Sequence, residues 1–149
     1  MQKRFFCRIF MALTVICTAC GHSGNIQSDA EKVAQEFAEA YFNYDFKKAT
    51  GLVTEESRKW IEFKASNVSM DDIALLREQN RGASVETTNA ETQGENMATV
   101  TVSVSDFLES DSIAGKGHIV DNATFDLQLE QTAEGVWKVR MEGPLRSGK

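Results

Sequence analysis

The stretch MATVTVSVSDFL, residues 97–108, decides the fold class of this chain. Valine alternates in it with threonine and serine, so an extended strand here has one apolar and one polar face. The same two-residue period runs through residues 85–92 and 117–131, and it returns in a short segment around Trp137. Polar turns that contain glycine, such as QGEN at 93–96, separate these segments. The pattern predicts an antiparallel sheet of about four strands.

Before residue 83 the apolar period is that of amphipathic helices. Ser28 with Glu31 forms a capping-box pattern at the start of the first and longest helix. Ser69 with Asp72 forms a second one at the start of the last helix. Helices followed by an antiparallel meander indicate an α+β domain.

The beginning of the chain has the pattern of an export signal. Three basic residues and no acidic one precede an apolar run at residues 9–17, which is too short to span a bilayer as a stable helix. The small pair Thr18-Ala19 before Cys20 resembles the lipobox of bacterial lipoproteins, in which the cysteine takes a diacylglycerol and becomes the mature N-terminus. The resemblance implies that residues 1–19 are a signal peptide and that Cys20 joins the protein to a membrane. An ordinary secretory signal is the alternative.

The remaining chain divides into three parts. Residues 20–27, small and polar after the cysteine, are expected to form a flexible tether. Residues 28–143 form a single domain, and residues 144–149 form a C-terminal tail. Surface-exported lipoproteins of Bacteroidota resemble one another in acidic residues just after the cysteine, and residues 21–27 contain none. We therefore expect a lipid-anchored envelope protein on the outer membrane, facing the periplasm.

Charge and composition exclude several classes of function. The chain has 16 Lys and Arg against 22 Asp and Glu, and no basic cluster follows Arg8, so nucleic acid is not an expected partner. No cysteine follows Cys20, which excludes a disulfide, a cysteine nucleophile and a cysteine-ligated metal in the domain. The two histidines, His22 and His118, are too few and too far apart for an imidazole-based zinc site. We expect no metal and no cofactor.

Two motifs resemble the nuclear transport factor 2-like superfamily. One is Tyr-x-x-Asp-Phe-x-x-Ala, in which Tyr41 or Tyr44 leads into residues 45–49, and the other is GVWKV at 135–139. The chain is similar in particular to small bacterial lipoproteins of that superfamily classed as domains of unknown function. The resemblance implies a cone, in which the N-terminal helices pack in the concavity of a curved sheet. The sheet wraps the first helix, and an opening lies at the wide end. Members include isomerases, dehydratases, ligand binders and scaffolds, so the fold does not decide the function.

Strand parity offers two acidic candidates for the inside of the cone. It would place Asp106 with the valines and Asp121 with Phe125, and buried acids beside aromatic rings move protons in the ketosteroid-isomerase-like branch. A bulge at Asp121 and a register shift near residue 107 would turn both outward, and we expect solvated strand ends. We expect the large side chains mainly to fill the cone, with an open ligand cavity as the alternative. The candidate pocket residues are Tyr41, Trp60, Asp106, Asp121, Phe125 and Trp137.

No catalytic residue can be carried over from the superfamily, so we expect a non-enzymatic domain that binds a protein, a glycan or a small ligand. A small lyase or isomerase is one alternative. A structural module that forms a homodimer through the polar sheet face, with Thr99, Thr101 and Ser103, is another. Asp-Ser-Ile at residues 111–113 resembles an O-glycosylation signal of exported Bacteroidota proteins, with Ser112 as the acceptor.

Overall fold

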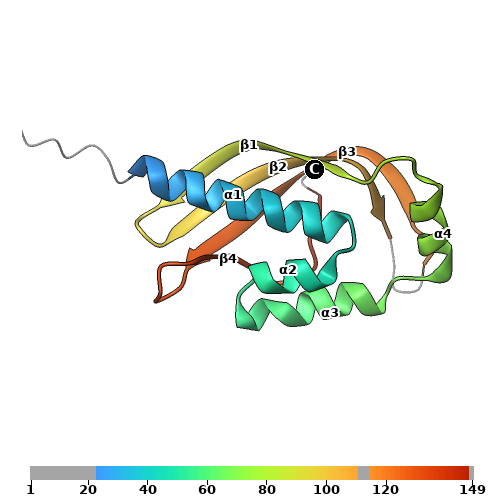
Figure 1. Cartoon of the computed structure of the whole chain (residues 1–149), viewed down its shortest axis with the longest axis horizontal. Coiled ribbons are helices and arrows are strands. Elements are labelled where there is room, and N and C mark those ends of the chain that lie inside the picture. Colours follow the sequence, from blue (N-terminus) through green and yellow to red (C-terminus); the bar gives the residue numbers. More distant parts are fainter. Residues whose placement is uncertain (1–22, 111–114, 148–149) are drawn as a thin grey trace, which may run out of the picture.

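The computed structural model describes residues 23–110 and 115–147, which form helices followed by one antiparallel sheet (Figure 1). The helices are α1 (Ser23–Phe42), α2 (Phe46–Leu52), the short 3-10 helix η1 (Glu55–Ser57), α3 (Arg58–Ser66) and α4 (Met70–Glu78). The strands are β1 (Ser84–Gln93), β2 (Met97–Glu109), β3 (His118–Gln131) and β4 (Trp137–Arg140). The predicted α+β class is confirmed.

The sheet is a meander with the strand order β1-β2-β3-β4, and each strand pairs antiparallel with the next. Gly94 and Gly135, in the first and last turns, have φ of +73° and +79°, a conformation that glycine adopts without steric cost. β4 is short; it pairs with residues 128–131 of β3, and its Val139 also forms a parallel bridge with Val53. The sheet curves around α1, as predicted (Figure 1).

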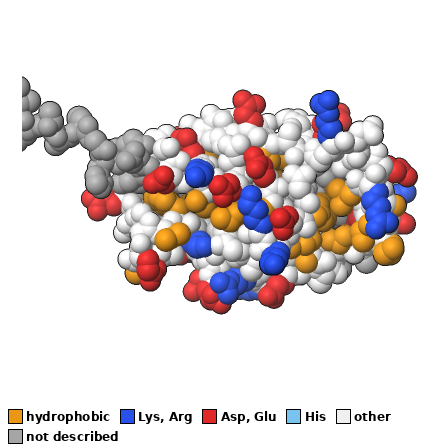
Figure 2. Space-filling view, in the orientation of Figure 1, with side chains coloured by type: hydrophobic (Ala, Val, Ile, Leu, Met, Phe, Trp, Pro, Cys, Tyr) orange, Lys and Arg blue, Asp and Glu red, His pale blue; other side chains and the backbone are white. Residues whose placement is uncertain are grey.

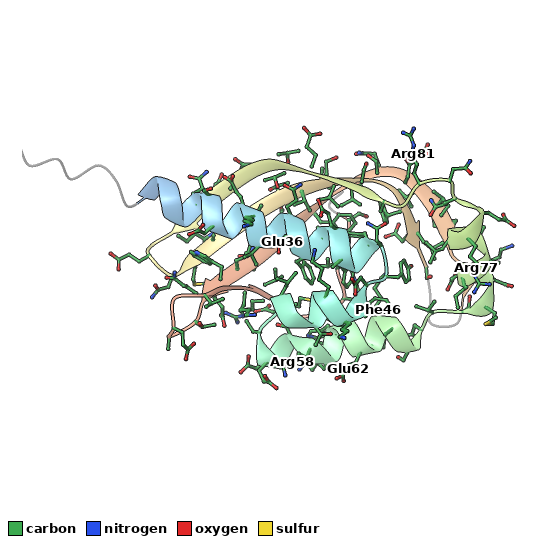
Figure 3. All side chains as sticks on the ribbon, in the orientation of Figure 1. Glu36, Phe46, Arg58, Glu62, Arg77 and Arg81 are labelled. Atoms are coloured by element: carbon green, nitrogen blue, oxygen red, sulfur yellow. The ribbon has the colours of Figure 1, made fainter. Side chains whose placement is uncertain are left out.

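The core lies between α1 and the concave face of the sheet. Val100, Val102 and Val104 on β2 are fully buried, as their alternation predicts. Ala30 and Ala34 on α1 are fully buried as well, and their small side chains let the helix approach the strands closely. Charged side chains of the outer helices, such as Arg58 and Glu62 on α3, are exposed to solvent (Figure 3).

The first helix begins at Ser23, earlier than the expected start at Ser28. The side-chain amide of Gln27 donates hydrogen bonds to the carbonyl oxygen of Ala90 on β1 and to the carboxylate of Glu31, both at 3.1 Å. Glu31 is therefore bonded to Gln27, and Ser28 lies inside the helix instead of capping it. The described part of the expected tether, residues 23–27, is helical. No helix within the described ranges is both long and apolar enough to cross a membrane.

The convex face of the sheet carries a ladder of polar side chains joined across the strands. The hydroxyl of Thr99 bonds Gln128 at 3.0 Å and that of Thr101 bonds Asp126 at 2.7 Å. The amide of Asn122 donates to Ser103 at 3.0 Å. These cross-strand pairs stabilise the sheet from its solvent side.

Candidate functional site

A cavity of about 640 Å³ opens where the C-terminal end of α1, the end of α3, the start of α4 and the ends of β2 meet the C-terminal tail. Figure 2 shows hydrophobic side chains gathered between the end of α1 and α4. The aromatic and aliphatic lining consists of Tyr41, Phe42, Tyr44, Phe63, Val68, Phe107, Leu108, Phe125, Pro144 and Leu145. The charged lining consists of Lys64, Asp72, Glu109 and Arg146. This end of the molecule is the wide end of the cone, where the fold places an opening.

Three buried phenylalanines form the floor of the cavity. The ring centroid of Phe42 lies 5.2 Å from that of Phe107 and 4.7 Å from that of Phe125. The rings of Phe107 and Phe125 are 5.5 Å apart and meet edge to face. Such tilted pairs stabilise the packing beyond the area that they bury. The three rings thus belong to the buried core and also line the cavity.

Lys64, on α3, brings its ammonium group to the lining of the cavity. Its Nζ lies 5.0 Å from the ring centroid of Tyr41 and 5.2 Å from that of Tyr44, within the range of cation–π attraction. Burial lowers the pKa of Lys64, while the negative charges of Glu109 and Asp72 act in the opposite direction. A lysine held between two tyrosine rings combines a charge with an apolar wall.

Tyr44 reaches this position through an unusual backbone conformation. It follows α1 with φ of +65°, in the left-handed region where glycine usually ends a helix. The N–H of Asp45 donates to the carbonyl oxygen of Ala40 at 2.9 Å and closes the helix end. A residue with a Cβ is destabilised by about 1–2 kcal/mol in this region. The contacts of the Tyr44 ring in the cavity must offset this unfavourable backbone energy. Burial, and then the charge of Asp72, raise the pKa of the Tyr44 hydroxyl, which therefore stays neutral.

Asp72, on α4, is one of the cavity residues that the sequence pattern did not identify as part of a site. Its side chain is 1% exposed. Oδ1 accepts a hydrogen bond from the backbone N–H of Gly117 and Oδ2 accepts one from that of Ser69, both at 2.9 Å. Burial alone raises the pKa of Asp72, but the hydrogen bonds from Ser69 and Gly117 and the charge of Lys64 together lower it. The predicted Ser69–Asp72 capping box is confirmed, but its pattern gave no sign of the contact with Gly117.

Asp106 and Asp121 are exposed and do not line the cavity. Asp106 has φ of +56°, and the pairing of β2 with β3 passes from Ser105 to Phe107 without it. This reversal points Phe107 instead of Asp106 into the core. The inward parity is therefore wrong for both acids, which are exposed as expected. The expected register shift is also wrong, because the pairing continues unchanged from Ser105 with Asn122 to Phe107 with Val120.

The other candidate pocket residues are distributed over the molecule. Tyr41 and Phe125 line the cavity. Trp60 is half-buried on α3, with its ring 6.5 Å from that of Phe63, and Trp137 is buried in the core; neither lines the cavity. Cys20 and Ser112 lie outside the described residues. Within the described ranges, no group of His, Cys, Asp and Glu side chains is arranged to hold a metal ion.

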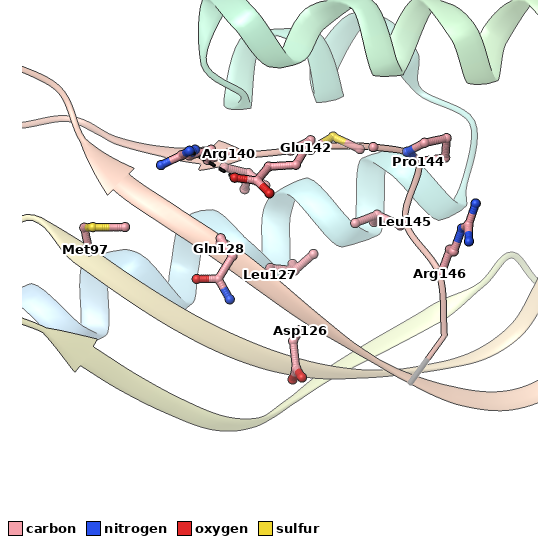
Figure 4. Close-up of a pocket in the computed structure, with 12 residues that line it drawn as sticks. Met97, Asp126, Leu127, Gln128, Arg140, Glu142, Pro144, Leu145 and Arg146 are labelled. Carbon is pink, nitrogen blue, oxygen red and sulfur yellow. Dashed lines mark hydrogen bonds and ion pairs between the residues drawn. The ribbon is translucent and has the colours of Figure 1, made fainter. Parts of the chain in front are cut away.

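A second hollow, of about 450 Å³, lies between β3 and the tail (Figure 4). Arg140 and Glu142 form an ion pair at 3.0 Å on its rim. Pro144, Leu145 and Arg146 line both this hollow and the cavity, and Leu145 packs against the core. The tail is thus a wall shared by the two.

Comparison with solved structures supports the fold, whereas comparison of the sequence with known families and proteins finds no match. No family model matches the chain, and no curated protein matches it either. The structure is similar to that of a ketosteroid isomerase-like protein from Erwinia carotovora atroseptica SCRI1043, with a TM-score of 0.50 and 14% identity over 76% of this chain and 89% of that chain. An Ntf2-like protein involved in plasmid conjugation gives a TM-score of 0.47 and 16% identity, over 83% of this chain and 50% of that chain. The helices in the concavity of a curved meander and the first of these similarities show that this chain has the nuclear transport factor 2-like cone fold.

Proposed function

We propose that this chain is a lipid-anchored envelope protein whose cone domain binds a small ligand in the cavity at its wide end, without converting it. The cavity is the observation that carries the proposal. Its volume of about 640 Å³ lies within the range of roughly 300–1,000 Å³ that is typical of small-molecule sites. An aromatic floor with a few polar groups near the mouth is the usual lining of such sites. Among the ligand classes that the sequence leaves open, these features favour a small molecule over a protein or a glycan.

The state of Asp72, the buried acid of the cavity, supports binding over catalysis. A carboxyl group that transfers protons near neutral pH needs a raised pKa. The pKa of Asp72 is instead lowered, and backbone N–H groups occupy both of its oxygens. Asp72 is therefore suited to holding α4 in place and poorly suited to acting as a base or an acid.

The proposed membrane anchor is Cys20, and the sequence around it supports this assignment. Thr18 and Ala19 are small enough for cleavage before Cys20, and no other cysteine of the chain has such neighbours. The domain would then face the periplasm from the outer membrane.

NMR titration of the full chain, purified from membranes, tests the binding function. The probes are 4-phenylbutan-1-ol and 4-phenylbutanoate, two soluble compounds of nearly equal size that differ in charge. We expect at least one of them to shift the signals of Leu108 and Phe125. Filling the cavity by Val68→Trp should remove these shifts, while the control Val136→Trp, at an exposed position outside the cavity, should leave them. If neither compound shifts the cavity signals at millimolar concentration, the proposal is wrong.

A further inference from the structure

We propose that the ligand of the cavity carries an anionic group of the carboxylate kind, which pairs with Lys64, and an apolar body that lies on the phenylalanine floor. This inference rests on the proposed function and narrows it to a chemical class of ligand.

The ammonium group of Lys64 has hydrogen-bonding capacity left over. It carries three N–H donors. Within the described part of the chain, its close contacts are the faces of the Tyr41 and Tyr44 rings, and no oxygen accepts a hydrogen bond from it or pairs with it within 4 Å. Ring faces attract a cation but do not replace an oxygen acceptor. A carboxylate that entered the cavity would supply the missing acceptor.

The acids near Lys64 oppose the effect of burial on its pKa, although burial is the larger effect. Asp72 and Glu109 both act to raise its pKa against the effect of burial. The oxygens of Asp72 accept hydrogen bonds from the N–H groups of Ser69 and Gly117, and these bonds stabilise its negative charge. Lys64 is half-buried, so a pairing charge at this place is screened less than at an open surface.

The surroundings of Lys64 suit the rest of such a ligand. Burial raises the pKa of both Tyr41 and Tyr44, so neither hydroxyl becomes an anion that would repel a carboxylate. The floor of Phe42, Phe107 and Phe125 offers ring edges and faces to an apolar body. The charge and the apolar surface thus lie within one cavity, as an amphipathic acid requires.

The test compares the dissociation constants of 4-phenylbutanoate and 4-phenylbutan-1-ol for the full chain at neutral pH by NMR titration. We expect the acid to bind about tenfold more tightly than the alcohol, because the carboxylate adds ionic attraction to the hydrogen bond that either compound can accept from the ammonium group. Lys64→Met, which keeps most of the apolar stem, should bring the two constants within about threefold of each other by the same reasoning. Lys64→Arg should preserve the preference for the acid.

Lys59→Met is the matched control. Lys59 lies on the same helix with its Nζ 5.2 Å from the ring centroid of Trp60, but it does not line the cavity. Its variant should keep the preference of the wild type. The inference is overturned if the wild type binds both compounds equally well, a comparison that needs no variant to fold. It is also overturned if Arg146→Gln removes the preference while Lys64→Met retains it. Binding of neither compound would instead reject the proposed function.

Discussion

The buried carboxylate of Asp72 accepts a hydrogen bond from the backbone N–H of Gly117 at 2.9 Å, and this contact joins α4 to the segment that enters β3. The two residues meet so closely that a Cβ on Gly117 would lie 2.6 Å from Oδ1 of Asp72. Leu108 stands on the other side, with its Cδ1 2.9 Å from the same point. The contact fixes α4 as one wall of the cavity.

Replacing Gly117 by alanine should weaken this wall. Because the added methyl group overlaps the Asp72 carboxylate, we expect Gly117→Ala to lower the free energy of unfolding by about 1–3 kcal/mol, as measured by urea denaturation. Gly51→Ala is the control. Gly51 lies in α2, and a Cβ added there would meet no atom within 4 Å, so alanine should be neutral or stabilising by up to about 1 kcal/mol. Equal effects of the two variants would contradict the close contact.

Asp72→Asn should destabilise the fold by about 1–3 kcal/mol at neutral pH, because an amide nitrogen would face one of the two backbone donors. The pH dependence should change as well. The folded-state pKa of Asp72 is lower than the unfolded value of about 3.9, so its stabilisation is complete above that value and is lost as the pH falls through the lower folded-state pKa. The variant should lack this loss at acid pH.

Asp71→Asn provides the comparison for both effects. Asp71 precedes Asp72 on α4 but is exposed. Urea unfolding of the three proteins at a series of pH values measures the difference. Should Asp72→Asn and Asp71→Asn follow the same curve, the assigned role of the buried carboxylate would be wrong.

Trp137→Ala should cost about 3–5 kcal/mol of unfolding free energy, the range of large truncations in a core. Trp137 is 4% exposed and belongs to the core cluster, which confirms the inward face predicted for β4. Its neighbour Val136 is 49% exposed, so Val136→Ala should stay within about 0.5 kcal/mol of the wild type. Chemical denaturation of both variants checks the contrast, and a loss below about 1 kcal/mol for Trp137→Ala would argue against it.

Cys20→Ala should release the protein from membranes, because the acylated thiol is the proposed anchor. Cys17→Ala should leave membrane association unchanged, since Ile16 is too large for the position before a cleavage site. Fractionation of cells that express each variant gives the answer. Persistent membrane association of the Cys20 variant would rule out the lipid anchor.

The elements of the fold were predictable because their signals are local. Alternation around Val102 predicts a strand that is buried on one face, and the Ser69–Asp72 pair predicts the start of a helix. Gly94 and Gly135 mark turns that need a left-handed residue. Each of these signals lies within a few residues of the feature that it determines.

The site was not predictable in the same way, because distant segments create it. In the sequence, Lys64 has the pattern of a surface residue and Tyr44 that of a residue at a helix end. They meet only because α3 packs beside the end of α1 in the folded chain. The role of Asp72 depends on Gly117, a residue 45 positions along the chain. The inward position that strand alternation predicted for Asp106 is wrong because its left-handed backbone reverses the alternation of side chains. A two-residue sequence period does not encode such a reversal.

The early start of α1 determines how far Cys20 can lie from the folded domain. Gly21 and His22 alone stand between Cys20 and the first residue of the helix, a link of at most about 11 Å. The helix then extends by about 30 Å over its 20 residues, and the cavity lies at its far end. With Cys20 as the proposed anchor, the cavity would lie at the end of α1 opposite to the lipid attachment, separated from it by the length of that helix.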